Sequence, residues 1–452
     1  MLNKASSKAD LAIESLMTSS ARAGGGTRGL LGGRASVGYW AKALVSKHLA
    51  SMQRGKLLVE TQGEIEAFGD LSDSAELVAH ITVKSEQLYS AVALNGVIGA
   101  GEAYMDGHWS SPDLVAVVRF FVINMQSLHA LDGERSWLNR VGLKLLDKLN
   151  RNTLARAKKN ISAHYDLGND FFDLFLDPTM MYSSAVFTDA NMSLHEASTA
   201  KLESICRQLA LQPSDHLVEI GTGWGGMAIY AAQNYGCRVT TTTISEQQYE
   251  FARSRVEALG LEKQVTVLME DYRDLRGEYD KLVSIEMIEA VGHQYFSEYF
   301  RQCSALLKPN GLMCIQAITI ADQRYERAKR SIDFIQRYIF PGGCLPSVST
   351  IGQHVAQDTD MTITSLIDIG LDYALTLQHW REQFMSKLDS VREQGFDERF
   401  IRMWEFYLCY CEGGFRERVI STAQIVMAKP DYRLASQRGS VGTVDKPAAM
   451  AT

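Results

Sequence analysis

The sequence predicts an α/β protein with a Rossmann-like, seven-stranded doubly wound sheet, preceded by a small N-terminal α+β domain. Three observations lead to this prediction. A strand, a glycine turn and a helix follow one another over residues 217–233, as in the nucleotide-binding unit of such sheets. In the N-terminal part, Leu77, Ala79, Ile81 and Val83 alternate as in a half-buried strand. Six further strand candidates follow the glycine turn, most of them separated by helical segments: 237–245, 264–271, 279–287, 311–320, 361–369 and 423–429.

The glycine turn within residues 219–226, EIGTGWGG, is typical of a nucleotide-binding site, and by itself it fits NAD or FAD equally well. Gly221, Gly223 and Gly225 lack the Cβ atoms that would keep a ligand away from the backbone, and they tolerate positive φ. A dinucleotide site would place an acidic residue about 20 positions later, where it binds the ribose. The second strand ends instead in a run of hydroxyl side chains. The pattern therefore favours S-adenosylmethionine (SAM) over NAD or FAD.

The composition is that of an ordinary globular protein, with 46% hydrophobic and 22% charged residues among 452. The net charge of −7 argues against general nucleic-acid binding. Seven cysteines without metal-ligand spacing indicate reduced thiols in a cytoplasmic protein and no metal site. No stretch approaches the roughly 18 apolar residues of a membrane span, so any membrane contact is expected from the surface.

Composition and pattern divide the chain into five regions. The two ends are polar and low in complexity and are expected to be disordered. The regions are a tail at 1–35, a small lipid-associated domain at 36–130, a basic helical connector at 131–159, the catalytic domain at 160–430 and a tail at 431–452.

Two segments before the catalytic domain are candidates for membrane contact. The amphipathic helix predicted between Tyr39 and Met52 either lies on a membrane surface or docks on the next domain. The cations of the connector either form a solvated face or contact anionic lipid, which would gain about 1 kcal/mol per cation. The sequence leaves both alternatives open.

Chemistry-bearing residues gather in three parts of the catalytic domain. Residues 160–185 combine Tyr182 with several phenylalanines, as a capping helix or as an aromatic cover over SAM. The fourth strand ends in Glu286 and Glu289, whose carboxylates are costly in apolar surroundings unless they are paired or used. The long insert at 321–350 predicts a lid, and it carries a rigid loop with two prolines and two glycines.

Seven stretches, in this order along the chain, carry a family pattern: HYDLGNDFFDLFLDPTMMYSSAVF (164–187), EIGTGWGG (219–226), TTTISEQQ (241–248), EDYRDL (270–275), SIEMIEAVG (284–292), YIFPGGCLPS (338–347) and YLCYCEGGFRER (407–418). Together they resemble the cyclopropane-fatty-acyl-phospholipid synthase family, which includes the mycolic-acid cyclopropane synthases and related fatty-acyl C-methyltransferases. The short segment AYMDGHW (103–109) resembles the phospholipid-acting branch of that family.

The resemblance implies a SAM-dependent methyltransferase that acts as a homodimer on membrane phospholipid, in the cytoplasm and peripherally associated with the inner face of the membrane. It assigns seven residues to SAM binding: Tyr182, Gly221, Gly223, Thr243, Gln248, Tyr272 and Arg273.

The resemblance also implies a bicarbonate ion beside the methyl group, held by a cysteine, a glutamate, a histidine, an isoleucine carbonyl and a tyrosine. Glu289, Ile318 and Tyr338 match three of these ligands. The cysteine is replaced by Ser184 and the histidine by Gln316. Both residues still carry groups that can donate hydrogen bonds to an anion, so bicarbonate is expected to be retained at an altered site.

The predicted function is therefore transfer of a methylene group from SAM to the cis double bond of a phospholipid acyl chain, through a carbocation that bicarbonate deprotonates. The changes at Ser184 and Gln316 support one alternative, a C-methyltransferase with a methyl-branched or methylene product. A second alternative is a SAM- and lipid-binding protein without catalysis.

Overall fold

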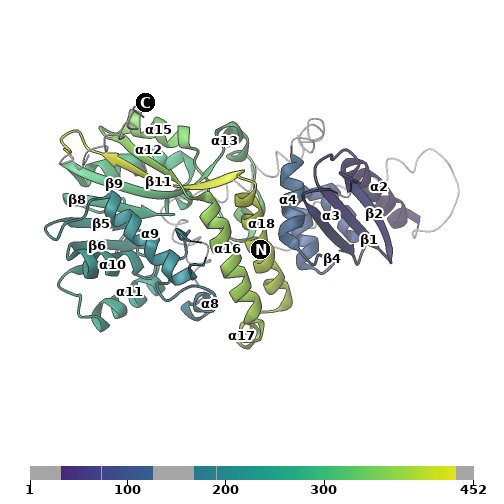
Figure 1. The fold of residues 1–452 in the computed structure, drawn as a ribbon, viewed down its shortest axis with the longest axis horizontal. Coiled ribbons are helices and arrows are strands. Elements are labelled where there is room, and N and C mark those ends of the chain that lie inside the picture. The colour runs from purple at the N-terminus through teal and green to yellow at the C-terminus, as the bar shows by residue number, and fades with distance from the viewer. Residues whose placement is uncertain (1–31, 73, 126–166, 190, 434–452) are drawn as a thin grey trace, which may run out of the picture.

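The computed structural model describes residues 32–72, 74–125, 167–189 and 191–433. The connector predicted at 131–159, the first residues of the catalytic domain and most of both tails therefore lie outside the described residues. Figure 1 shows a small N-terminal module beside a larger α/β part, with two long helices between them. The predicted fold class is confirmed.

The N-terminal module packs helices against a four-stranded sheet of order β2-β1-β3-β4. The expected strand around Ala79 is β3, which pairs with β1 in parallel and places Ala79, Ile81 and Val83 in the core. The module's first helix begins at Gly32, a few residues before the predicted domain boundary. Its elements are α2 (Gly32–Leu49), β1 (Lys56–Thr61), β2 (Glu64–Gly69), β3 (Val78–Val83), α3 (Gln87–Met105), β4 (Trp109–Ser110) and α4 (Leu114–Ile123).

The large part is built on a seven-stranded sheet of order β10-β11-β9-β8-β5-β6-β7. The five strands from β9 to β7 in this order are all parallel to one another. The strand β11 pairs antiparallel with both β9 and β10. The chain winds outward from β5 in both directions, so the switch point lies between β5 and β8, where such sheets bind ligands. The strands are β5 (His216–Ile220), β6 (Arg238–Thr243), β7 (Val265–Met269), β8 (Tyr279–Ile285), β9 (Leu307–Ile320), β10 (Thr362–Asp368) and β11 (Ile420–Ala428).

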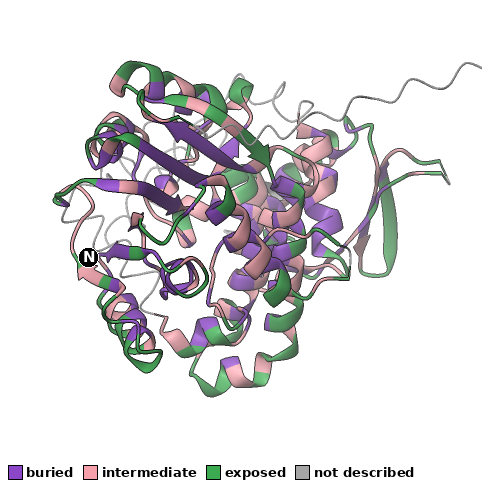
Figure 2. Ribbon diagram, turned by 60° about the vertical axis from the view of Figure 1, so that its left-hand side comes forward, coloured by how far each residue is buried: buried purple, intermediate pink, exposed green. Residues whose placement is uncertain are grey.

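Helices cover both faces of this sheet, and its central strands are buried (Figure 2). One apolar cluster joins the sheet to α9, α10 and α11, and another joins it to α12 and α15. A capping box of Ser193 and Glu196 fixes the start of α9. These helices are α9 (Leu194–Gln208), α10 (Gly226–Tyr235), α11 (Glu246–Ala258), α12 (Phe296–Ala305) and α15 (Val348–Asp358).

A third apolar cluster continues from the carboxyl side of the sheet into the N-terminal module. It is rich in aromatic rings, which α16 and α18 supply together with the short helix α8. The insert that was predicted as a lid folds into α13 and α14 before α15. The elements are α8 (Asn169–Asp173), α13 (Asp322–Ala328), α14 (Phe334–Tyr338), α16 (Gly370–Ser386), α17 (Leu388–Glu393) and α18 (Glu398–Arg416).

The N-terminal module docks closely on α18 and α14. A Cβ added to Gly101 on α3 would lie 2.6 Å from the ring of Phe334, and one added to Gly413 on α18 would lie 2.6 Å from Val118. The Tyr104 hydroxyl donates to Glu405 at 2.7 Å across the same boundary. Glycines thus allow two helix surfaces to approach where a side chain would hold them apart.

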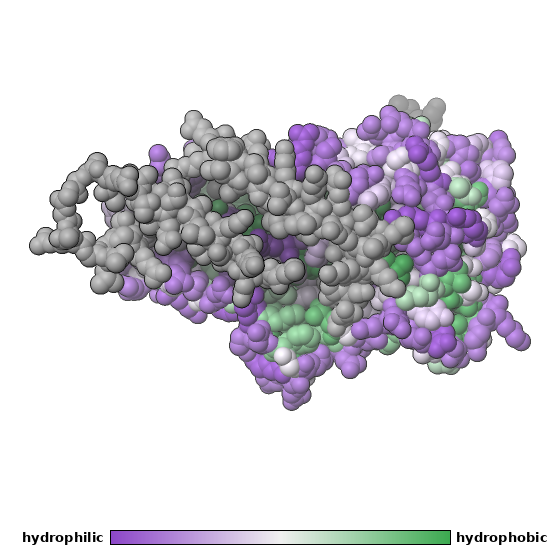
Figure 3. Space-filling view, turned by 180° about the vertical axis from the view of Figure 1, so that it is seen from behind, coloured by the Kyte–Doolittle hydropathy of each residue, from purple (hydrophilic) through white to green (hydrophobic). Residues whose placement is uncertain are grey.

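The surface combines charged areas with exposed apolar side chains. On α2, Tyr39 and Trp40 are 71% and 70% exposed. Figure 3 shows hydrophobic patches among hydrophilic residues on the face drawn there. Within the described residues, no helix has both the length and the apolar composition needed to cross a membrane.

Candidate active site

The glycine turn lies where the sequence places it, between β5 and α10. Gly221, Gly223 and Gly225 all have positive φ, of 98°, 51° and 87°. A Cβ at Gly223 would meet no atom within 4 Å, and one at Gly221 would meet only the side chain of Met287, at 3.3 Å. The turn therefore presents open backbone at the switch point of the sheet, as the binding of a nucleoside ligand requires.

The other residues assigned to SAM lie at the same edge, at the ends of the next two strands. Thr243 ends β6, and its hydroxyl donates to the side-chain oxygen of Gln248 at 2.9 Å. Tyr272 and Arg273 follow β7. The Arg273 guanidinium makes two hydrogen bonds to Asp271, at 2.8 and 2.7 Å, so this side chain orders its own loop. These side chains and the open turn fit SAM, which supplies an electrophilic methyl group when it is bound.

Tyr182 sits in a cluster of aromatic rings, here called the aromatic cluster: Phe172, Tyr182, Trp224, Phe340, Trp380 and Tyr407. Its ring centroid lies 5.1 Å from that of Trp380, and its hydroxyl lies 2.8 Å from that of Tyr407. Trp224 belongs to the glycine turn itself. Ring faces beside this turn are suited to a sulfonium cation.

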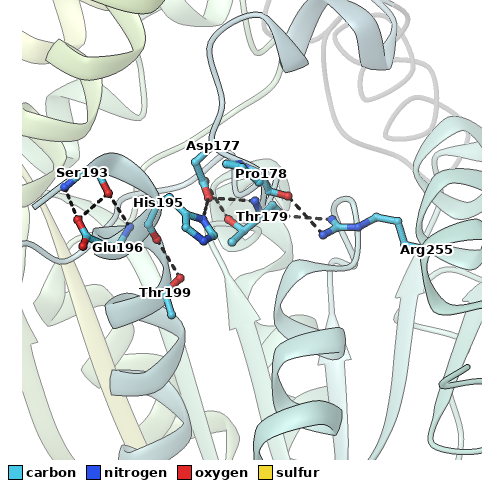
Figure 4. A network of polar contacts seen from close by, with 8 residues as sticks. All are labelled: Asp177, Pro178, Thr179, Ser193, His195, Glu196, Thr199 and Arg255. Carbon is cyan, nitrogen blue, oxygen red and sulfur yellow. Dashed lines mark hydrogen bonds and ion pairs between the residues drawn. The ribbon is translucent and has the colours of Figure 1, made fainter. Parts of the chain in front are cut away.

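Polar contacts hold residues 177–179, which precede Tyr182, against α9 and α11 (Figure 4). Asp177 accepts hydrogen bonds from the backbone and hydroxyl of Thr179, at 2.9 and 2.8 Å, and lies 3.0 Å from His195 on α9. Arg255 on α11 donates to the carbonyl oxygens of Thr179, at 3.2 Å, and Trp224, at 3.0 Å. Arg255 therefore joins the segment that precedes Tyr182 to the glycine turn that contains Trp224.

Glu286 is the first residue after β8, and its backbone adopts a left-handed φ of 49°. Its Oε1 accepts hydrogen bonds from the backbone N–H of Ser184, at 2.9 Å, and from the side-chain amide of Gln316, at 2.8 Å. Its Oε2 accepts one from the Tyr373 hydroxyl, at 2.8 Å. Burial raises the pKa of Glu286, and these three hydrogen bonds oppose the rise because they favour the ionised form.

A hydrogen bond from Gln424 fixes which way the side-chain amide of Gln316 points. Gln316 lies on β9, and its side-chain oxygen accepts a hydrogen bond of 3.0 Å from Gln424 on the neighbouring strand β11. Its NH₂ group therefore faces Glu286 and the carbonyl oxygen of Ser184, to which it donates at 3.1 Å. The glutamine is a fixed donor toward one carboxylate.

Glu289, three residues further on, accepts fewer hydrogen bonds than Glu286. It lies on the short 3₁₀ turn η1 (Ile288–Ala290), where its Oε1 accepts a hydrogen bond from the backbone N–H of Ile318. Its Oε2 is buried without a hydrogen-bond partner among the described residues. Burial, with a further contribution from the negative charge of Glu286, raises the pKa of Glu289 to about 8. Glu289 is therefore mostly protonated at neutral pH.

A buried lysine, Lys201, lies close enough to Glu286 for the two charges to interact. Lys201 on α9 donates to the Ser183 hydroxyl at 2.8 Å. Burial lowers the pKa of Lys201 to about 8, and attraction to Glu286 opposes that fall. Glu219 of β5 is also buried, which raises its pKa to about 8, and it accepts a hydrogen bond of 2.6 Å from Thr241. Charge on Lys201 thus favours an ionised Glu286.

The ligand set implied for bicarbonate does not fit a free anion in this arrangement. Glu289 and Ile318 lie together as expected. The backbone N–H of Ser184 and the amide of Gln316, however, already donate to Glu286. A second anion would find these donors engaged and a like charge beside it.

The hydroxyl of Tyr338, which the resemblance assigns to the bicarbonate site, bonds the N-terminal module in this structure. It donates to Glu102 of that module, and Arg337 lies 3.0 Å from the same carboxylate. The loop after Tyr338 does reach the site, since the backbone N–H of Cys344 donates to the carbonyl oxygen of Glu289 at 2.8 Å.

The tyrosine at the carboxylates is Tyr373, which sequence reasoning missed. Tyr373, Leu377, Trp380 and Phe384 are buried along α16 at helical spacing. This pattern is typical of a core stripe, so nothing in the sequence singles out one hydroxyl on it. Lys201 was missed for a similar reason, because a lysine on an amphipathic helix is normally solvated.

Comparisons with known proteins identify the family of this chain. The profile of the mycolic acid cyclopropane synthetase family matches residues 152–425. The tuberculostearic acid methyltransferase UfaA1 of Mycobacterium tuberculosis is 38% identical over 348 residues, covering 75% of this chain and 81% of the relative. The cyclopropane-fatty-acyl-phospholipid synthase of Escherichia coli is 37% identical over 356 residues, covering 78% and 88%.

Solved structures give the same assignment. The cyclopropane synthase MmaA2 of Mycobacterium tuberculosis matches with a TM-score of 0.57 and 30% identity, over 60% of this chain and 98% of its own. The mycolic acid cyclopropane synthase CmaA1, solved with SAH and CTAB, gives the same four values. This chain belongs to the cyclopropane-fatty-acyl-phospholipid and mycolic acid cyclopropane synthase family, and it is a SAM-dependent methyltransferase.

Proposed function

We propose that this enzyme transfers a one-carbon unit from SAM to the cis double bond of an unsaturated acyl chain in a membrane phospholipid, and that a cyclopropane ring forms. The Escherichia coli relative is a cyclopropane-fatty-acyl-phospholipid synthase, and the match covers 88% of its length. One observation carries the proposal: the glycine turn, the aromatic cluster and two glutamates lie together at one edge of the large sheet.

Contacts between these three parts make the edge a single site. The side chain of Met287, next to Glu286, lies 3.3 Å from where a Cβ on Gly221 would be. Ser184, which donates to Glu286, is two residues from Tyr182 of the aromatic cluster. An isolated alkene is a poor nucleophile, so the reaction needs the methyl group and the double bond to be held in line at near-attack distance.

Methyl transfer would leave a carbocation on the neighbouring carbon of the acyl chain. Aromatic faces stabilise such a cation, and closely packed rings exclude the water that would convert it to an alcohol. The cation must then lose a proton from the new methyl group if a ring is to close. Glu286 is the described group at this edge with the hydrogen bonds of an ionised carboxylate, and Glu289 lies beside it.

A second product class is supported by a specific observation. Ser184 and Gln316 replace the cysteine and histidine of the family pattern, and both bond Glu286. A base in a different position would remove a different proton, which gives a methyl-branched alkene or, after a hydride shift to the cationic carbon, an exocyclic methylene. One relative at 38% identity is named a tuberculostearic acid methyltransferase.

Product analysis tests the proposal. Purified full-length protein is incubated with SAM and vesicles of a defined cis-unsaturated phospholipid, and the fatty acids are examined by proton NMR. High-field ring protons are expected. Cyclopropane and methylene products have the same mass, so an exocyclic alkene signal without ring protons would assign the second product class. Absence of any methylated lipid would contradict both.

Membrane contact and assembly belong to the same proposal. We propose that the enzyme works as a homodimer, peripherally bound at the cytoplasmic face of the membrane. The exposed Tyr39 and Trp40 on α2 support contact with a lipid surface, because aromatic rings of this kind favour the membrane interface. Vesicle co-sedimentation and analytical ultracentrifugation test these two points separately.

A further inference from the structure

The backbone at Glu286 is the first sign that this side chain has a special role. Its φ of 49° lies in the left-handed region, which residues other than glycine seldom adopt. Its backbone N–H still continues the sheet pattern by donating to the carbonyl oxygen of Gln316 at 2.7 Å. An unfavourable conformation persists where the surroundings require it, and such conformations concentrate at functional sites.

The partners of the Glu286 carboxylate are the second sign. Three segments far apart in the chain each contribute one donor: the backbone of Ser184, the amide of Gln316 and the hydroxyl of Tyr373. Ser184 and Gln316 occupy the two altered positions of the ligand set that the resemblance assigns to bicarbonate. A carboxylate and a bicarbonate ion share a planar CO₂⁻ group whose two oxygens accept hydrogen bonds, and bicarbonate carries a hydroxyl in addition.

The third sign is the difference in surroundings between two neighbouring carboxyl groups. Burial raises the pKa of both groups, but the groups around them act differently. Glu286 has three donors and the attraction of Lys201, all of which favour its ionised form. Glu289 has one donor and an unpaired oxygen, and the charge of Glu286 disfavours its ionisation. Pairs of carboxyl groups with such unequal surroundings commonly divide the roles of base and acid.

We propose that the carboxylate of Glu286 takes the place of bicarbonate and is the base that receives the proton, so the enzyme needs no free anion. This inference rests on the proposed function and deepens it. The step balances within the chain and its substrates. The electron pair of a C–H bond of the transferred methyl group forms the bond to the cationic carbon that closes the ring, and the proton moves to an oxygen of Glu286. That proton passes to solvent before the next turnover.

The first test uses the wild-type enzyme, with unsaturated phospholipid vesicles and SAM, in buffer freed of carbon dioxide and in the same buffer with bicarbonate added. Methyl transfer is measured from labelled SAM. Equal turnover in both buffers is expected. Turnover that falls without bicarbonate and returns with it would overturn the inference and leave the proposed function intact. No turnover in either buffer would overturn both.

Two variants sharpen the result. Glu286→Gln keeps the shape of the side chain without a basic oxygen, so turnover should fall by about 10²–10⁴-fold, the range for loss of a general base. Added bicarbonate should not restore it, because the carboxamide still fills the site. Glu286→Gly suits the left-handed backbone and opens a space among the three donors. Its turnover should fall similarly and recover with bicarbonate.

SAM affinity and the midpoint of thermal unfolding serve as checks that both variants are folded. Both variants should bind SAM as the wild type does, since Glu286 is not part of the glycine turn. Wild-type turnover in folded Glu286→Gln would overturn the inference. So would a folded Glu286→Gly variant that loses turnover and does not respond to bicarbonate.

Discussion

The two sides of the site, the glycine turn and the carboxylate pair, are built in opposite ways. The turn comes from one stretch of eight residues, 219–226, and works through backbone that lacks side chains. The carboxylate side is assembled from side chains and backbone of segments that lie far apart in the chain, around Ser184, Glu286, Gln316 and Tyr373. One side supplies space, and the other supplies charge and hydrogen bonds.

This difference predicts that the two sides are separable in kinetics. Changes at the turn should alter SAM affinity, because they remove the space for the ligand. Changes at the carboxylates should alter turnover at unchanged SAM affinity, because they affect a group used after methyl transfer begins. A substitution on one side that produced the effect of the other would break the comparison.

The largest effect is expected at the turn. Gly221→Ala places a Cβ on a backbone with φ of 98°, beside Met287, and should weaken SAM binding by at least about 100-fold. Isothermal titration with SAM measures it. Gly236→Ala is the matched control, because Gly236 also has positive φ, at 68°, but ends α10 away from the site. The control should lose stability without losing affinity, and unchanged affinity in Gly221→Ala would mean that the pocket lies elsewhere.

A smaller effect is expected for Tyr373→Phe, which removes one donor from the Glu286 carboxylate. A hydrogen bond to a charged group contributes about 1.5–3 kcal/mol, so turnover should fall roughly ten- to a hundredfold. Tyr338→Phe is the matched control, since its hydroxyl bonds Glu102 instead. It should lower the free energy of unfolding by about 1 kcal/mol. If Tyr338→Phe lost more turnover than Tyr373→Phe, the catalytic role that the resemblance assigns to Tyr338 would be supported instead.

The smallest effect concerns stability and pH at Glu289. Its pKa is raised from 4.5 to about 8 in the folded protein, so between these values the folded state binds a proton that the unfolded state does not. The free energy of unfolding therefore falls as pH rises through this window. Glu289→Gln keeps the neutral shape and should flatten that dependence, measured by thermal unfolding between pH 5 and about 8. A slope identical to that of the wild type would show that Glu289 is ionised in the folded enzyme.

The same difference explains what the sequence could predict. A glycine turn after a buried strand is a local pattern, so the sequence predicts the position of the turn at Gly221 and Gly223, and local periodicity predicts the seven strands. The carboxylate side depends on which distant residues meet. Glu286 is a charged residue in an apolar stretch, which indicates a special role. Its hydrogen-bond donors cannot be predicted in the same way, because they depend on how β8, β9 and α16 pack beside one another.

Two positions show the limit of carrying family roles over by pattern. Tyr338 stood in a stretch that resembles the family, yet its side chain turns toward Glu102 on the N-terminal module. Tyr373 lies in no stretch that was singled out, and its hydroxyl reaches the carboxylate. A stretch that matches a family locates backbone well, but the direction of a side chain depends on the packing around it.

The central claim is that a carboxylate of the chain itself fills the anion site. Binding of ¹³C-labelled bicarbonate, observed by NMR on the folded enzyme with SAH, tests this without relying on turnover. The wild type should show no bound bicarbonate, whereas Glu286→Gly should bind it and Glu286→Gln should not. The account would be contradicted if bicarbonate bound to the wild type and if neither substitution at Glu286 altered that binding.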